Sequence, residues 1–492
     1  MAQPRWLLAP GAIALLLCLA FPALGQGRFG QKQEADLANF GVIGARGDVN
    51  GSSLRVREVL EGGGAKQAGL SPGDEIVGVG GKSFGKDPLL ELYAAIEAAE
   101  AARKRQPLLL KVLRGGSEIE LKVPVARLGD CSKSCPNKCK RCDKVIKAGL
   151  GFLAKTQAGN GCFPTDLGGK TGLVVVTSLG GLAFMSAGIS PKPGTPAGRA
   201  VDYVLKNANT PDTGGLGGAG GRGNWNQENW AHAYALCFLA EVAYKTRRKD
   251  VKAKVKELAQ KLLSTMEQTG GWAHGPGGPN ALGYLELEIV SNYALLGLGA
   301  ARRLGIELDE GKLAKAMAWI ESTAAADGGV GYSHRSGQKG FGDPGRTAGA
   351  LVAYVALGQK KRPFFKKMAG YYANHVGGLP EGHVSPAMHI LAGSMAAHVL
   401  GKKAQRVFHK SYRTLLLGQR RPDGSFGSMP TKESKQLSNN TDLTVGPRWT
   451  TASYVLALTL GRKKIPLLLG EKIKGEKKSK KATKREGPTG GK

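Results

Sequence analysis

A short motif of glycine followed by an aromatic residue recurs through the C-terminal two thirds of this chain, and it constrains the fold more than any other feature. The copies lie roughly 45 to 60 residues apart, a period that fits repeated helical hairpins better than the blades of a β-propeller. The repeat predicts about six helical hairpins. In the third strong copy the aromatic residue is Tyr332. Strong copies are at residues 157–163, 268–272, 327–332 and 419–426, and weaker copies are at 212–216 and 376–379.

The segments on the two sides of each motif differ in character. A charged amphipathic segment such as 251–266 precedes a motif, and a more apolar segment rich in small residues, such as 285–301, follows it. A helix with a charged face belongs outside, whereas a helix that is apolar all round belongs inside. We therefore predict two concentric rings of helices over residues 143–462. The predicted inner helices are 173–187, 229–246, 286–302, 346–357, 386–400 and 448–460.

This pattern resembles the α/α-toroid proteins, which include terpenoid cyclases and protein prenyltransferase β subunits. Their Gln-x-x-x-Gly-x-Trp/Phe repeat joins helical hairpins, and the resemblance implies that the Gln amide stacks on the aromatic ring and caps a helix end. The chain lacks the Asp-x-Asp-Asp motif of the protonating cyclases, and it lacks an Asp-x-Cys with a distant matching His for a prenyltransferase zinc site. The resemblance therefore implies a fold, an (α/α)6 toroid, and leaves the activity open.

A smaller unit precedes the repeats, at residues 36–128. An alternating strand at 54–59 is followed by the run A-x-x-A-G-L-x-P-G-D-x-I at 65–76, a helix at 88–102 and two closing strands. This order and this run closely resemble a PDZ domain, a small α+β fold. The whole arrangement resembles a bacterial family of exported proteins with a PDZ domain and a helical toroid.

The PDZ resemblance implies capture of a peptide end or loop by strand addition, with loop amides holding a terminal carboxylate. The usual Gly-Leu-Gly-Phe loop is not reproduced. The alternative is that these residues are plain core and that the protein's own chain fills the groove. The predicted peptide-binding residues are Phe40, Gly41, Val42 and Ile43 in the loop and Leu89 and Tyr93 on the helix.

The first 25 residues have the pattern of a secretory signal. Arg5 supplies the positive charge, residues 7–19 form an apolar stretch too short to span a bilayer, and residues 23–25 supply small side chains for cleavage. An uncleaved anchor is the alternative. We expect an exported protein, periplasmic or secreted, which does not span a membrane after cleavage because no later run of 18 apolar residues exists.

Four cysteines crowd together in the linker at residues 129–142. Cys131, Cys135, Cys139 and Cys142 are separated by three, three and two residues. In an oxidising compartment such a cluster more often forms two short-range disulfides, although the spacing also suits a tetrahedral zinc site, and free thiols are the third alternative. No other cofactor is expected.

Charge and composition limit the partners. The chain carries 70 Lys and Arg against 38 Asp and Glu, a net charge of +32, which attracts anionic partners. Residues 463–492 form a Lys-rich tail that we predict to be disordered, either as an anchor to an anionic envelope component or as a solubilising tail. No motif for reading nucleic acid is present, so a specific nucleic-acid partner is not expected.

Several polar residues are predicted to face the toroid. Glu228 and His232 are four residues apart and share one helix face, and with His274 they are the candidate catalytic residues. Arg346 opens an inner helix and is a candidate anion-binding residue. Glu286, Glu288, His334 and Asp343 belong to the same rim, whereas the histidines between residues 375 and 409 lack metal-like spacing.

Two functional hypotheses follow. The first is an exported binding or scaffolding protein, in which the PDZ domain captures a peptide segment and the toroid presents a concave binding surface. The second is a toroid enzyme that the PDZ domain regulates or targets: a lyase or hydrolase acting on an envelope polysaccharide, or a terpenoid-cyclase-like catalyst. The missing motifs favour the first. A deep pocket with converging acids and bases would favour the second.

Overall fold

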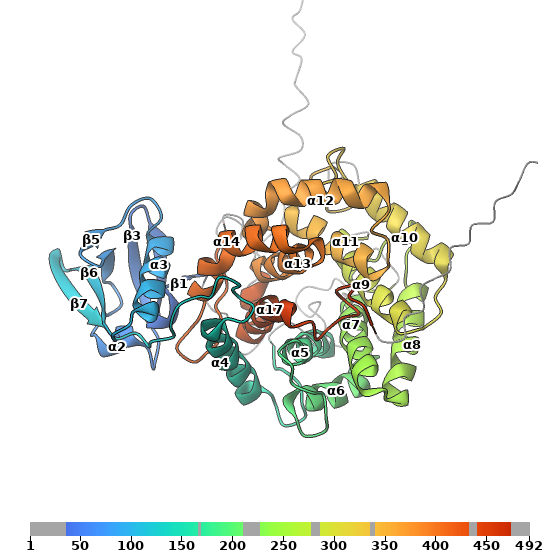
Figure 1. Ribbon diagram of the computed structural model, residues 1–492, viewed down its shortest axis with the longest axis horizontal. Coiled ribbons are helices and arrows are strands. Elements are labelled where there is room, and N and C mark those ends of the chain that lie inside the picture. The colour runs from blue at the N-terminus through green and yellow to red at the C-terminus, as the bar shows by residue number, and fades with distance from the viewer. Residues whose placement is uncertain are drawn as a thin grey trace, which may run out of the picture.

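The computed structural model describes residues 36–165, 169–209, 227–276, 286–334, 340–431 and 440–473. Within them it has a small domain built on a β-sheet, here called the sheet domain, beside a ring of helices (Figure 1). The predicted signal segment and residues 474–492 lie outside the described residues.

The sheet domain is antiparallel, with strand order β1-β2-β3-β4-β6-β7 and β5 paired to β4. Leu108, Leu110 and Val112 of β6 alternate with less buried residues, as a strand with one core face requires. The strands are β1 (Ala38–Asn39), β2 (Ala45–Asn50), β3 (Ser53–Val59), β4 (Glu75–Val79), β5 (Lys82–Ser83), β6 (Leu108–Arg114) and β7 (Ser117–Val123), and the helical segments are η1 (Gly41–Ile43), α2 (Gly64–Gln67) and α3 (Pro88–Ala101).

Twelve helices of the described residues form a closed double ring, which confirms the predicted toroid. Each inner helix packs against the next, and the last inner helix packs against the first (Figure 1). The inner helices are α5 (Gly169–Ser186), α7 (Glu228–Thr246), α9 (Glu288–Arg303), α11 (Pro344–Ala356), α13 (Pro386–Leu400) and α17 (Pro447–Thr459). The outer helices are α4 (Lys140–Thr156), α6 (Pro196–Asn207), α8 (Lys249–Ser264), α10 (Glu310–Thr323), α12 (Pro363–His375) and α14 (Lys402–Gly418).

The two ends of the helical region interlock to close the ring. Five outer helices pack on the inner helix that precedes them, whereas α4 packs on α17, the last inner helix. Ser186 and Thr459 also hydrogen-bond across the α5–α17 seam, with 2.7 Å between their hydroxyl oxygens. Helix α5 is long and apolar enough to cross a membrane, but most of its side chains are buried inside the ring, as in a core helix.

The four strong glycine motifs are turns that lead from an outer helix to an inner helix, and they share one geometry. The weaker copy at 212–216 lies outside the described residues, and the one at 376–379 forms a short 3-10 helix (η3, Val376–Glu381). Each of the four strong copies contains a glycine with positive φ, between 89° and 113°, a backbone conformation that favours glycine over other residues. Two residues later, a backbone N–H donates to a buried hydroxyl on the inner helix that follows, so each turn is fixed to its helix. The glycines are Gly161, Gly270, Gly328 and Gly424, and the N–H to hydroxyl pairs are Phe163–Thr177, Trp272–Ser291, Val330–Thr347 and Phe426–Thr451.

The third turn differs from the prediction. Val330, and not Tyr332, occupies the position of Trp272, because its N–H makes the equivalent bond to the inner helix. Tyr332 corresponds instead to His274. The carbonyls of these two residues accept the N–H groups of Glu288 and Asn229, near the starts of α9 and α7. The turns therefore place the side chains of Tyr332 and His274 at the N-terminal end of the inner ring.

The opposite end of the ring is covered by residues 463–473, here called the C-terminal strap. We predicted a disordered tail from residue 463, but Ile465, Leu467, Leu468 and Leu469 are all buried. Arg303, at the end of α9, donates to the carbonyls of Pro466 and Leu467. The apolar run in the strap packs into the end of the ring. Because lysines surround this run in the sequence, the whole segment was predicted to be disordered.

The strap encloses a buried carboxyl group. Glu241 of α7 is 1% exposed and accepts a 2.9 Å hydrogen bond from the Leu468 N–H. Burial raises the pKa of Glu241 to about 8, although the strap amides and Arg303 oppose the shift. At neutral pH this carboxyl therefore keeps its proton in the folded protein.

Stability is expected to fall as pH rises from about 4.5, the ordinary pKa of a glutamic acid, towards 8. The pKa is raised on folding, so over this range the folded form holds a proton that the unfolded form has lost. Measuring the melting temperature against pH should show a smaller decline for Glu241→Gln than for the wild type. Glu307→Gln, at an exposed position, is the matched control. An unchanged decline in Glu241→Gln would contradict the assignment.

Candidate functional site

Aromatic side chains from several walls meet at the centre of the ring. Tyr234 of α7 stacks on Tyr293 of α9 with ring centroids 4.5 Å apart, and lies 5.9 Å from Trp449 of α17. The Tyr234 hydroxyl also reaches the sulfur of Met388 on α13, the inner helix opposite α7, at 3.9 Å. Side chains therefore fill the ring at this level.

Trp230 completes this group, which we call the aromatic floor: Trp230, Tyr234, Tyr293 and Trp449. Its ring lies 6.3 Å from that of Tyr234 and 6.0 Å from that of Tyr293. Trp230 and Tyr293 are only half-buried, whereas Tyr234 and Trp449 are buried. Two small hollows among the described residues, of about 10 and 30 Å³, each have room for about one water molecule, and no residue of the floor borders them.

A cluster of charged groups lies at the N-terminal ends of α9, α11 and α13, and we call it the acid cluster: Glu288, Tyr332, Asp343, Arg346 and His389. Glu288, the first residue of α9, is fully buried. Burial raises the pKa of Glu288 well above its ordinary value, although the Arg346 charge and the Asn292 amide oppose the shift. Its Oε2 has no hydrogen-bond partner among the described residues. Glu288 is therefore held as a neutral acid.

Asp343 has the opposite character. Its Oδ1 accepts the N–H of Arg346 at 2.8 Å as the N-cap of α11, and lies 3.3 Å from Nδ1 of His389. Burial acts to raise the pKa of Asp343, but the His389 and Arg346 charges outweigh it and hold the pKa below its ordinary value. The cluster thus contains two carboxyl groups with opposite protonation at neutral pH, an arrangement that separates an acid from a base.

His389 is the residue that the sequence analysis missed. Its Nε2 lies 3.1 Å from the carbonyl of His383, and its Nδ1 faces Asp343. Both ring nitrogens therefore face oxygen atoms of the protein. Gly345 and Gly382 approach the ring so closely that a Cβ at either position would collide with it. No local spacing in the sequence signals this contact.

Arg346, predicted to bind an anion, is 8% exposed and lies inside the acid cluster. Its guanidinium carbon is 4.9 Å from the centre of the Tyr332 ring, a cation–π contact, and its charge acts on Glu288 and Asp343. The positive charge of Arg346 therefore faces carboxyl groups of the protein itself.

Two of the three predicted catalytic residues, Glu228 and His232, do not point to the ring centre. His232 and Glu228 lie on one face of α7, but that face is about half a helical turn from Trp230 and Tyr234, which point to the centre. Burial, with a contribution from Lys261 of α8, lowers the pKa of His232 to about 3. His232 therefore faces the outer ring, and Glu228, at the first position of α7, is half-buried.

His274 does reach the aromatic floor. Its Nδ1 accepts a 2.8 Å hydrogen bond from Nε1 of Trp230, and burial lowers the pKa of His274 to about 4. A second pair repeats this contact away from the floor, where Nε1 of Trp319 donates to Nδ1 of His334 at 3.0 Å. His274 is thus a neutral residue that orients Trp230.

The predicted peptide-binding residues lie at or near the junction with the ring. Phe40, Gly41 and Ile43 are buried, while Val42 and Leu89 are half-buried. A Cβ on Gly41 would lie 3.4 Å from the carbonyl oxygen of Gly418, at the end of α14. The loop therefore lies against the ring. The strand that follows the loop is β2, and β1 pairs with one of its edges.

Tyr93 belongs to the same junction. Its hydroxyl donates to the carbonyl of Asn39 and accepts from the side-chain amide of Gln419 at 3.1 Å. The Asn39 amide in turn donates to the carbonyls of Gly418 and Arg420, each at 3.2 Å. Residues on both sides of the expected groove thus contact the protein's own ring.

A buried ion cluster joins the two domains more firmly. Glu100 of α3 accepts a two-pronged contact from Arg420, at 2.9 and 2.8 Å, and a further bond from Arg141 of α4. The side chains of Glu100 and Arg141 are each 1% exposed. One carboxylate therefore lies between two guanidinium groups at the centre of the interface.

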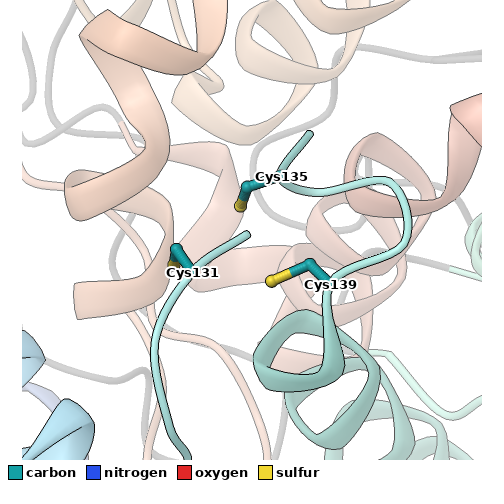
Figure 2. Close-up of side chains that lie close together, drawn as sticks. All are labelled: Cys131, Cys135 and Cys139. Atoms are coloured by element: carbon teal, nitrogen blue, oxygen red, sulfur yellow. The ribbon is translucent and has the colours of Figure 1, made fainter. Parts of the chain in front are cut away.

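The four linker cysteines converge beside this interface. The sulfurs of Cys131, Cys135 and Cys139 all lie within 4.8 Å of one another, and Figure 2 shows these three side chains facing a common point. The sulfur of Cys142 is 3.3 Å from that of Cys135. All six cysteines of the described residues are free, so the predicted disulfides are not present in the structure.

Comparison with known proteins supports the division into two domains. A family model described as "Domain of unknown function (DUF6288)" matches residues 142–470, and the PDZ domain model matches residues 32–112. The sheet domain is thus a PDZ domain. No curated protein matches the chain.

Two kinds of solved structure resemble the helical part. The GH76A α-1,6-mannanase from Salegentibacter sp. HEL1_6 has 12% identity and a TM-score of 0.46, covering 65% of this chain and 99% of its own. The type II terpene cyclase MstE from Scytonema has 15% identity and a TM-score of 0.37, covering 65% of this chain and 99% of its own. Neither reaches a TM-score of 0.5, so neither likeness says anything about the activity of this chain.

Proposed function

Because this chain belongs to the family described as domain of unknown function DUF6288, its role has to come from its own side chains, and we propose that its ring binds a saccharide on the aromatic floor. The observation that carries this proposal is the group of four aromatic rings at the ring centre, two of them half-buried. A sugar ring has an apolar face, which suits an aromatic ring, and a polar edge, which needs hydrogen-bonding groups.

Polar groups of the required kind adjoin the floor. His274 adjoins the floor through its hydrogen bond with Trp230. The acid cluster adds Tyr332 and Asp343, both partly exposed, at the same end of the inner ring. Pockets for small molecules commonly combine such apolar surfaces with a few fixed polar groups.

PDZ domains bind peptide C-termini, but the contacts of this one support a different role. Tyr93 and the loop at Gly41 contact the ring, so we propose that the PDZ domain is a fixed support for the ring in this arrangement. Capture of a peptide would then require the two domains to separate. We also propose that the protein is exported. The ligand of the ring is then an envelope polysaccharide, and the basic tail anchors the protein to an anionic polymer.

The proposal is tested by measuring binding of the full chain to a panel of neutral and acidic envelope oligosaccharides. Trp230→Leu is expected to raise Kd about 30-fold, because a central aromatic anchor is worth about 2 kcal/mol and 1.4 kcal/mol is tenfold. Trp319→Leu is the matched control, since it also removes a Trp-to-His hydrogen bond but lies on outer helix α10. Binding by no oligosaccharide, or equal loss in both variants, would refute the proposal.

A second candidate function is hydrolysis of the bound saccharide. It is favoured by the two carboxyl groups of the acid cluster, of which Glu288 is held neutral and Asp343 ionised. Cleavage of a glycosidic bond uses such a pair, with one group protonating the leaving oxygen and the other acting as a base or nucleophile. The same binding assay, followed by measurement of new reducing ends, separates a binding protein from an enzyme.

A further inference from the structure

The four linker cysteines form a site that neither the ring nor the PDZ domain explains. A tetrahedral zinc site with Zn–S bonds of about 2.3 Å places its sulfurs about 3.8 Å apart. Three of the sulfurs here lie within 4.8 Å of one another. The fourth, that of Cys142, is outside this group but lies 3.3 Å from the sulfur of Cys135. The separation between Cys135 and Cys142 is well above the roughly 2.05 Å of a disulfide.

The local sequence explains why four thiols converge. The spacings of three, three and two residues fall within the short intervals usual for zinc ligands. Cys139 is the N-cap of α4 and Cys142 lies three residues later, so both sulfurs are on one side of the first helical turn. The linker then folds back, which brings Cys131 and Cys135 to the same point (Figure 2).

The surroundings suit a site of negative charge. Four thiolates and one Zn²⁺ carry a net charge of −2, and the N-terminal end of the seventeen-residue helix α4 favours negative charge. The N–H of Ser132 points at the sulfur of Cys139 at 3.5 Å, the kind of contact that orients a thiolate ligand. The positive charges of Arg141 and Arg413 also act on Cys131. They offset the Glu97 carboxyl group, which lies 3.7 Å from the same sulfur.

We propose that Cys131, Cys135, Cys139 and Cys142 bind one Zn²⁺ in a structural site that fixes the PDZ domain to the ring. Binding converts four thiols to thiolates and releases their four protons, with no oxidation or reduction. The site has no ligand position left for substrate, which distinguishes it from a catalytic zinc centre.

The position of the site explains what the metal would stabilise. The linker leaves the PDZ domain after β7 and enters the ring at α4. Glu97 of α3 lies 3.7 Å from the Cys131 sulfur, and it also contacts Arg413 at 3.1 Å and Thr414 at 3.1 Å on α14. A metal at this point therefore holds the linker against both partners of the interface.

The test begins with the wild-type full chain, purified without chelator or reductant. Its accessible free thiols are first alkylated under native conditions. Elemental analysis is expected to give about one zinc per chain. After denaturation with a chelator, fresh alkylating reagent should label the four linker cysteines, as peptide mapping will report, together with Cys162 and Cys237, which burial alone protects. Replacing zinc with Co²⁺ should give the absorption bands of a tetrahedral thiolate complex.

Variants separate this site from the other thiols. Cys135→Ser and Cys142→Ser are each expected to lose the zinc and lower the melting temperature, whereas Cys162→Ser and Cys237→Ser, in the ring, should retain it. Linker peptides joined by disulfides, or a chain with free thiols and no zinc, would overturn the proposal, as would iron in place of zinc. These measurements on the wild type decide the question even if a serine variant fails to fold.

Discussion

Replacing Glu100 with alanine is expected to lower the free energy of unfolding by about 3–5 kcal/mol, because removing one partner of a buried ion cluster leaves the others uncompensated. Glu100 lies between Arg141 and Arg420, and the side chains of all three are at most 9% exposed. The two guanidinium groups would lose their shared counter-charge in a place that water does not reach. Urea unfolding followed by fluorescence would measure the effect.

The Glu100 prediction has a specific signature, because this residue joins two domains. The variant is expected to unfold in two steps, with the PDZ domain separating before the ring unfolds. Glu118→Gln is the matched control, since its ion pair with Lys111 is at the surface and worth at most about 1 kcal/mol. A Glu100→Ala chain as stable as the control, with a single transition, would show that the interface does not hold the domains together.

The sequence was sufficient to predict the ring because its information is local and repeated. Each glycine turn combines a positive φ with a buried contact two residues later, and both requirements leave residues that can be recognised, such as Gly270 and Trp272. The third turn shows the limit of this reasoning. Val330 fills the aromatic position there, while Tyr332, two residues on, looks like the motif but faces the acid cluster.

The site was harder to predict because it depends on helix phase and on contacts between distant segments. Glu228 and His232 were correctly placed on one face of α7, but spacing alone does not tell which face points inward. His389 meets Asp343 across 46 positions of sequence, through space left by two glycines. The junction is more distant still, since Glu100 and Arg420 are 320 residues apart. Such pairings leave no periodic signal.

Glu288 is fully buried in this structure, so a hydrolase mechanism requires the acid cluster to open to the bound saccharide. In that case Glu288→Gln is expected to lower kcat by about 10²–10⁴-fold, with little change in Kd. The side-chain amide keeps the shape of the carboxyl group but has no acidic proton to give to the leaving oxygen. In the wild type, kcat should fall on the alkaline side as Glu288 loses its proton, and the raised pKa moves that fall above the ordinary range. Asp343 has a lowered pKa, so it stays charged until strongly acidic pH.

Two further variants separate catalysis from structure. Asp343→Asn keeps an N-cap for α11, because asparagine also caps helices, but it removes the negative charge, so kcat should fall while the fold is kept. Glu321→Gln changes a carboxylate that binds Tyr354 and Arg362 on the outer side of the ring, and should leave kcat unchanged. Wild-type turnover by Glu288→Gln would exclude it as the acid. Saccharide binding without turnover in any form of the chain would leave the ring as a binding protein, because the aromatic floor does not depend on the acid.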